Sequence, residues 1–133
     1  MIYTAETKQK MDSIMEAFAE YIQEQSYFDI LYSEKVGYIR IIAEMPEAES
    51  PMVIETPDSL VETIIGDVAD DLIAEKLRKP LPEDEDLPEE IKAEIYQQII
   101  ESVGRIGEDR EHYLDLARNY CQNRFEKRAD GEI

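Results

Sequence analysis

The groups in this chain with the most chemical potential are carboxylates at helical spacing between residues 67 and 75. They are Asp67, Asp70, Asp71 and Glu75. Carboxylates three and four residues apart share one side of a helix, where they can hold Mg²⁺, and Glu90 and Glu94 would supply a second pair. A Mg²⁺-dependent phosphohydrolase also needs cations to bind the phosphates of its substrate, and residues 41–75 contain no lysine or arginine. We therefore expect no bound metal, and this enzyme class is the weakest of three alternatives.

The single histidine and the single cysteine limit the catalytic chemistry further. His112 follows Glu108 by four residues and Asp109 by three, so one helix face can present an imidazole beside a carboxylate. A di-metal centre built on helices needs a second histidine. Cys121 is the only cysteine, which excludes an internal disulfide and a zinc site made of several thiolates. Because a Ser–His or Cys–His dyad has so few groups to draw on, we predict a protein without enzymatic activity and without a cofactor.

The negative charge is concentrated in the middle of the sequence. The chain has 32 acidic and 14 basic residues, for a net charge of −18, and 16 of the acids lie in residues 41–91 beside only three bases. Acids three or four residues apart on a helix lie ~5–6 Å from one another. We predict that the acids of this tract form a partner-binding face. They are Glu44, Glu47, Glu49, Glu55, Asp58, Glu62, Asp67, Asp70, Asp71, Glu75, Glu83, Asp84, Glu85 and Asp86.

A face this acidic selects the kind of partner that it can bind. It repels the phosphates of nucleic acids and the anionic head groups of membranes, so we expect neither as a direct ligand. It attracts basic proteins, and a dense array of carboxylates on a rigid body can imitate the phosphates of DNA. Our first interpretation is therefore an acidic interaction protein that occupies the nucleic-acid-binding groove of a basic partner, for example a nuclease or another DNA-binding protein, as a DNA-mimic-like inhibitor.

Two long amphipathic helices are predicted in the first two thirds of the chain. Residues 5–25 place apolar side chains at every third or fourth position, and Thr4 or Thr7 caps the start. Residues 56–58, Thr-Pro-Asp, combine a cap, a first-turn proline and a first-turn acid, which is a strong start signal for a second helix. Gly66 interrupts this second helix and indicates either a kink or close packing. Four acids complete the polar side of the first helix: Asp12, Glu16, Glu20 and Glu24.

Three short strands are predicted between these helices. Residues 28–33 and 36–44 are rich in aromatic and β-branched side chains, and Gly37 can adopt the positive φ that a bulged hairpin needs. Residues 52–55 provide a third short strand. Such a small antiparallel sheet needs helices over at least one face to bury its apolar side chains.

Two further helices are predicted near the C-terminus. One begins at Pro88 and the other covers residues 108–127, with Gly104 and Gly107 between them, so we expect an antiparallel pair. Their apolar stripes either pack on the domain or pair with a second copy of the chain. The second interpretation is therefore a small structural or assembly module that forms a homodimer through these helices. Residues 129–133 are predicted to be a frayed tail.

These elements give the order α-β-β-β-α-α-α and an α+β fold, with one acidic domain over residues 1–128. The predicted fold is a small three-stranded antiparallel sheet covered by helices, followed by the C-terminal antiparallel helix pair. No apolar run is long enough to span a membrane and no leader pattern is present, so we expect a soluble, cytoplasmic protein. Tyr3, Tyr27 and Tyr96 are expected to be less constrained than the tyrosines of the periodic elements.

Overall fold

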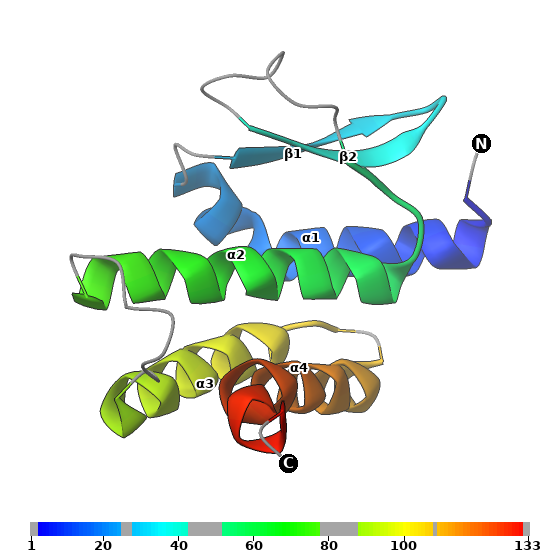
Figure 1. Ribbon diagram of the computed structural model, residues 1–133. Helices are drawn as coiled ribbons and strands as arrows, with labels where there is room; N and C mark the ends of the chain where they lie inside the picture. Colours follow the sequence, from blue (N-terminus) through cyan, green and yellow to red (C-terminus); the bar gives the residue numbers. More distant parts are fainter. Residues whose placement is uncertain (1–2, 25–27, 43–51, 78–87, 108, 132–133) are drawn as a thin grey trace. The chain divides into compact units, whose positions relative to one another are not determined.

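The computed structural model describes residues 3–24, 28–42, 52–77, 88–107 and 109–131, with the side chains of the last helix described as far as Arg124. The elements follow in the order α-β-β-β-α-α-α, which confirms the predicted α+β fold class (Figure 1). The chain divides into two compact units. The first unit comprises Met1–Leu60 and Ile106–Glu108, and the second unit comprises Val61–Arg105 and Asp109–Ile133. That residues 1–128 behave as one domain remains a prediction.

Helix α1 (Ala5–Glu24) has the amphipathic character that its spacing predicts. Thr4, rather than Thr7, provides the cap, because the Oγ1 of Thr4 accepts a hydrogen bond from the backbone N–H of Thr7 at 3.1 Å. The buried stripe of the helix consists of Met11, Ile14, Phe18 and Ile22. Full burial of one such side chain contributes about 1.5–3 kcal/mol, so this stripe is the main reason that α1 packs against its neighbours.

The sheet of the first unit contains three antiparallel strands in the order β1-β2-β3 (Figure 1). They are β1 (Phe28–Ser33), β2 (Gly37–Ile42) and β3 (Met52–Ile54). The register pairs Ile30 with Arg40 and Tyr38 with Ile54. Helix α1 packs against β1, so a helix covers one face of the sheet as predicted. The part of the second predicted strand beyond Ile42 lies outside the described residues.

The turn between β1 and β2 depends on Gly37 and on Tyr3. Gly37 has φ +88°, as predicted, and a Cβ atom at this position would clash with the hydroxyl oxygen of Tyr3. That hydroxyl accepts a hydrogen bond from the N–H of Tyr38 at 2.8 Å and donates one to the carbonyl oxygen of Ile54. Tyr3 is only 7% exposed, so the expectation that it is weakly constrained is wrong. No periodic pattern surrounds Tyr3, because its role is set by a hydroxyl contact with distant strands.

Helix α2 (Pro57–Leu77) begins where the sequence predicts. The Oγ1 of Thr56 accepts a hydrogen bond from the N–H of Ser59 at 3.0 Å, which confirms the cap. The first turn of α2 belongs to the first unit and the remainder to the second. In the second unit, a Cβ atom on Gly66 would lie 3.3 Å from the hydroxyl oxygen of Tyr120. Of the two predicted explanations for this glycine, the structure therefore supports close packing.

Helices α3 (Glu89–Val103) and α4 (Arg110–Gly131) form the predicted antiparallel pair (Figure 1). The N-terminal half of α3 lies beside the C-terminal half of α4, since Ala93 and Cys121 line one hollow of about 430 Å³. Helix α4 continues beyond its predicted end at residue 127, because residues 128–131 keep the helical backbone. The apolar stripes of the pair are buried in a single copy of the chain: Ile95, Ile99, Val103, Tyr113, Ala117 and Cys121.

Candidate functional site

The described part of the chain contains half of the acids that were predicted to bind a partner. Of these, Asp58 and Asp67 are half-buried and the others are exposed. The first unit contains Glu55 and Asp58, and the second unit contains Glu62, Asp67, Asp70, Asp71 and Glu75. The following predicted acids lie outside the described residues: Glu44, Glu47, Glu49, Glu83, Asp84, Glu85 and Asp86.

The acids of α2 are spread around the helix rather than aligned in one row. Successive residues of an α-helix are rotated by ~100°, so Asp67 lies about 140° around the axis from Glu62. Asp67, Asp71 and Glu75 follow at four-residue steps and form one row. Asp70 is rotated by about 100° from Asp71, so it lies away from that row. A partner that meets α2 from one side therefore faces only part of its negative charge.

Asp70 is bound by a cation of its own unit. Its Oδ1 accepts a hydrogen bond from Nη2 of Arg124 at 2.5 Å, and Nη1 of Arg124 donates to the hydroxyl of Tyr120 at 2.8 Å. Partial burial opposes the charged guanidinium, but the hydrogen bonds with Tyr120 and Asp70 outweigh it and raise the pKa of Arg124. Arg124 therefore stays charged and neutralises Asp70, which offers less charge to a partner than its exposure suggests.

Glu94, another acid considered for Mg²⁺ binding, is also paired with a cation. Nζ of Lys76 lies 2.8 Å from Oε2 of Glu94, one of the two acids considered for the second pair. The hydrogen bond with Glu94 and the attraction of its charge raise the pKa of Lys76, so this ammonium group stays charged at neutral pH. Within the described ranges, no three histidine, cysteine, aspartate or glutamate side chains are grouped closely enough to hold a metal ion. His112 is exposed and lies edge-on to Tyr113, with ring centroids 5.2 Å apart.

The only thiol of the chain is poorly suited to nucleophilic chemistry. Cys121 is 3% exposed, and burial raises the pKa of its thiol to about 11, with the charge of Arg124 acting in the opposite direction. The reactive form of cysteine is the thiolate, which is scarce at neutral pH when the pKa is this high. Cys121 therefore acts as a small apolar side chain of α4.

Helix α1 carries the longest aligned row of acids in the described structure. Asp12, Glu16, Glu20 and Glu24 follow at four-residue steps and are all exposed. Neighbours in this row are ~6 Å apart along the helix axis. We define the acidic row of α1 as these four residues. Among the described residues, no cation or hydrogen-bond donor is paired with the last three of them.

The charge count along the sequence did not identify this row. Lys8 and Lys10 lie in the same part of the chain and offset the acids in a total. In the structure, these two lysines form ion pairs with Asp12 and Glu6 near the start of α1, and they leave the remainder of the row without cations. The four-residue spacing of the acids is the sequence signal that could have found it.

The acidic row of α1 is unfavourable for the helix itself. Like charges four residues apart repel each other by a few tenths of a kcal/mol per pair. Glu24 also lies in the last turn, where the helix dipole is negative and where α1 has no basic residue. Together these effects cost about 1–2 kcal/mol. A sequence that keeps this arrangement despite its cost is consistent with a use for the charge outside the folded chain.

Asp12 forms the closed end of the row. Its two carboxylate oxygens lie 2.6 and 2.7 Å from Nζ of Lys8, and its Oδ1 accepts a hydrogen bond from the hydroxyl of Tyr38 at 2.5 Å. Partial burial opposes ionisation, but the hydrogen bonds from Lys8 and Tyr38 outweigh it and lower the pKa of Asp12. Lys8 also lies over the ring of Tyr32, 4.4 Å from its centroid. Asp12 thus ties α1 to β2, and the open part of the row begins at Glu16.

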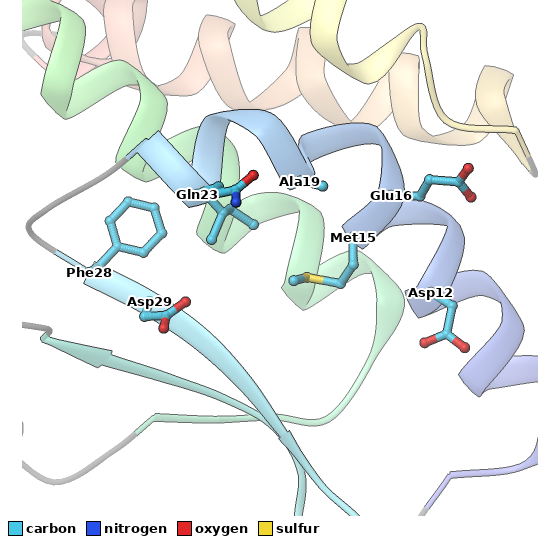
Figure 2. A pocket seen from close by; sticks show the side chains of 8 residues that line it. Asp12, Met15, Glu16, Ala19, Gln23, Phe28 and Asp29 are labelled. Atoms are coloured by element: carbon cyan, nitrogen blue, oxygen red, sulfur yellow. The ribbon is translucent and has the colours of Figure 1, made fainter.

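A groove runs between α1 and the start of β1 in the first unit, with a volume of about 670 Å³ (Figure 2). Its apolar walls are Met15, Ala19, Ile22 and Phe28. Three acids also line it: Asp12, Glu16 and Asp29. Figure 2 shows Met15 and Asp29 reaching into the space between the helix and the strand from opposite sides, whereas Glu16 points away from Met15. We call this feature the α1–β1 groove; it joins an apolar surface to the acidic row of α1.

The other face of the sheet carries exposed apolar side chains. The register aligns Leu31 with Ile39 and Ile39 with Val53, on the face opposite to the buried Phe28 and Ile30. Leu31 is 47% exposed and Val53 is 45% exposed. This apolar row was not anticipated, because three apolar residues in different strands become neighbours only through the strand register.

None of the described helices combines the length and the apolar character needed to cross a membrane. Comparisons with models of protein families, with curated proteins and with solved structures found no match to this chain. A proposal about function therefore depends on the two surfaces of the first unit and on the charge distribution described above.

Proposed function

We propose that this protein is a non-enzymatic interaction protein that binds a basic protein partner through exposed carboxylates. The open part of the acidic row of α1 is the observation that carries the proposal, since Glu16, Glu20 and Glu24 are exposed and have no cation among the described residues. A basic partner would relieve the repulsion within this row when it binds. The net charge of −18 would also speed the encounter by long-range attraction.

The spacing of the carboxylates on α1 limits how closely this helix can imitate DNA toward a basic partner. The acidic row of α1 presents one charge per ~6 Å, whereas each strand of DNA presents one per ~3.4 Å of axis. One such row is therefore too sparse to imitate a duplex without further acids, such as the row of Asp67, Asp71 and Glu75 or those outside the described residues. The narrower proposal is that the partner's basic surface is a nucleic-acid-binding groove, as in a nuclease, and that the protein inhibits it as a DNA mimic.

The test uses a basic nuclease as the partner and the combined substitution Glu16→Gln, Glu20→Gln and Glu24→Gln. Binding is measured by calorimetry at several salt concentrations, and nuclease activity is measured in parallel. We expect the wild-type protein to bind with an affinity that falls steeply as salt increases, and the triple variant to bind at least about tenfold more weakly. Duplex DNA should compete for the same surface if the narrower proposal holds.

The matched control removes the same number of charges from exposed acids that form no row. It combines Glu34→Gln, Glu90→Gln and Glu111→Gln. We expect this control to retain most of the affinity, because it changes the net charge equally and leaves the acidic row of α1 intact. Equal losses in both variants would show that binding depends on total charge and not on this row. No salt-dependent binding to any basic protein of a panel would refute the proposed function.

A second candidate function, assembly of copies of this chain, is supported by the apolar row of Leu31, Ile39 and Val53. The predicted dimer surface on α3 and α4 is less available, because Ile99 is completely buried within a single copy. A dimer would therefore use the open face of the sheet. In that case the negative charge would serve solubility, and repulsion between two chains of the same charge would oppose the association.

A further inference from the structure

The α1–β1 groove has the volume of a ligand-binding pocket and extends along about three turns of α1. Its lining residues on α1 extend from Asp12 to Gln23, which corresponds to ~17 Å of helix or about three turns. Its volume of about 670 Å³ lies within the range of roughly 300–1,000 Å³ that is usual for binding pockets. The groove therefore accommodates several side chains of a partner, and it is too long for a single small ion.

The chemistry of the groove favours an occupant that is both apolar and basic. Met15 is half-buried and Ala19 is exposed, so both offer apolar surface to a side chain that enters from outside. The described residues that line the groove include no lysine or arginine. One carboxylate oxygen of Asp29 accepts a hydrogen bond from the N–H of Ile30 at 2.8 Å, and the other oxygen is paired with none of the described residues. Together with Glu16, Asp29 provides negative charge on both sides of the apolar walls.

The edge of the sheet argues against an occupant that binds as an additional strand. Strand β1 lies at one end of the sheet order, where a peptide can pair with the backbone. The hydrogen bond from the N–H of Ile30 to Asp29 removes one donor that such a strand would need. An occupant that uses only its side chains does not depend on this donor. A helix of about three turns satisfies that condition and matches the length of the groove.

We propose that the α1–β1 groove binds a basic amphipathic helix of the partner protein. The apolar side of this helix packs on Met15 and Ala19, and its lysine or arginine side chains meet Asp29 and Glu16, the member of the open part of the acidic row of α1 that lines the groove. This inference rests on the proposed function and assigns it a place on the first unit. Apolar contacts in the groove make the recognition selective, because a basic segment without an apolar side would gain only the electrostatic attraction.

The test measures binding of a fluorescein-labelled synthetic helix of 14 residues, made of leucine and lysine with leucine on one side, by fluorescence anisotropy. A scrambled peptide of the same composition controls for charge alone. The variant Ala19→Arg places a long cation in the groove, and Ala74→Arg is the matched control at an exposed alanine of α2. We expect Ala19→Arg to weaken binding of the amphipathic peptide at least about tenfold, and Ala74→Arg to change it by less than about threefold.

Each outcome supports or contradicts the inference. Weaker binding of the scrambled peptide, together with the selective loss in Ala19→Arg, supports it. Equal binding of both peptides, or equal effects of the two arginine variants, overturns it and leaves the proposed function standing if the nuclease experiment succeeds. Circular dichroism verifies that Ala19→Arg is folded. If it is not, Ala19→Gln and Ala74→Gln, which lengthen the side chain without adding charge, replace the pair under the same criteria.

Discussion

Helices α1 and α2 have similar lengths and each buries an apolar stripe, yet they arrange their carboxylates differently. Helix α1 aligns four acids in one row and leaves three of them without a cation among the described residues. Helix α2 distributes its acids around the axis, and the second unit neutralises Asp70 with Arg124. Both units use part of their charge for internal ion pairs, and the first unit also keeps three aligned acids that are paired with no described cation beside a groove.

The comparison shows that net charge along a sequence and charge on a surface are different quantities. Residues 41–91 hold the larger negative total, but the described acids in that tract do not share one row. Residues 1–40 hold a smaller total, because they contain fewer acids and because their bases are counted against those acids. A partner responds to the local arrangement of unneutralised charges within about one Debye length, ~8–10 Å at moderate salt, so the smaller total can be the stronger site.

The free energy of unfolding should differ most between the two units when an apolar side chain of each is replaced by aspartate. Ile99 of α3 is completely buried, so Ile99→Asp leaves an unpaired charge in the interior and should lower the free energy of unfolding by about 3–5 kcal/mol. Leu31 is 47% exposed, so Leu31→Asp should change it by less than about 0.5 kcal/mol. Urea denaturation measures both values.

The same pair of variants tests assembly. If copies of the chain associate through the open face of the sheet, Leu31→Asp should yield monomers in light-scattering measurements while the protein stays folded. If Ile99→Asp instead gave a stable, folded monomer from a wild-type dimer, the predicted dimer through the C-terminal helices would be correct, and the open face of the sheet would not be the dimer surface.

The glycines of the two units should respond differently to alanine. Gly37 has φ +88° and touches Tyr3, so Gly37→Ala strains the backbone and disturbs the hydroxyl that joins β2 to β3. We expect a loss of about 2–4 kcal/mol in the free energy of unfolding. Gly66→Ala gains ~1 kcal/mol of helix propensity and crowds the hydroxyl of Tyr120, so its net change should be within about 1 kcal/mol of zero.

Thermal and urea unfolding measure the effect of both alanine variants. Tyr3→Phe provides the control for the first unit, because it removes the hydroxyl contacts without changing the backbone at Gly37. A mild effect of Gly37→Ala would contradict the constraint that Tyr3 imposes on this turn. A loss for Gly66→Ala as large as that for Gly37→Ala would mean that α2 and α4 cannot move apart by the few tenths of an ångström that the new methyl group requires.

The smallest changes in the free energy of unfolding should come from neutralising single carboxylates. The change should be a loss in the second unit and a gain in the first unit. Asp70→Asn removes the ion pair with Arg124, whose side chain is 33% exposed, so we expect a loss of about 0.5–1 kcal/mol. Glu20→Gln removes repulsion from Glu16 and Glu24, so we expect a gain of a few tenths of a kcal/mol. The free energies of unfolding at low and high salt measure both.

High salt should reduce the two effects together, because both are screened interactions of exposed groups. The control for Asp70→Asn is the double variant with Arg124→Gln, which isolates the energy of the pair. A destabilising Glu20→Gln would show that the acidic row of α1 has a structural role, and the argument that the folded chain bears a cost for this row would then fail.

The sequence by itself determined the helices, the strands and their order. The cap at Thr56, the positive φ of Gly37 and the apolar periods of α1 and α3 act within a few residues, so local physical chemistry is enough to specify them. The same locality explains the errors at helix and strand ends, such as the extension of α4 to Gly131, where helix propensity gives no sharp stop.

Only the tertiary structure decided which charges are open and which side chains are buried by distant contacts. The bonds of Tyr3 with Tyr38 and Ile54 and the pairing of Asp70 with Arg124 join residues far apart in the chain. The groove between α1 and β1 joins elements that are neighbours in the sequence, but it exists only because they pack together. Charge and hydrogen bonding act through space over a few ångströms, and the distance along the sequence carries no such information. For that reason the composition shows that the protein is acidic, whereas the tertiary structure shows which acids are paired with no described cation, namely Glu16, Glu20 and Glu24.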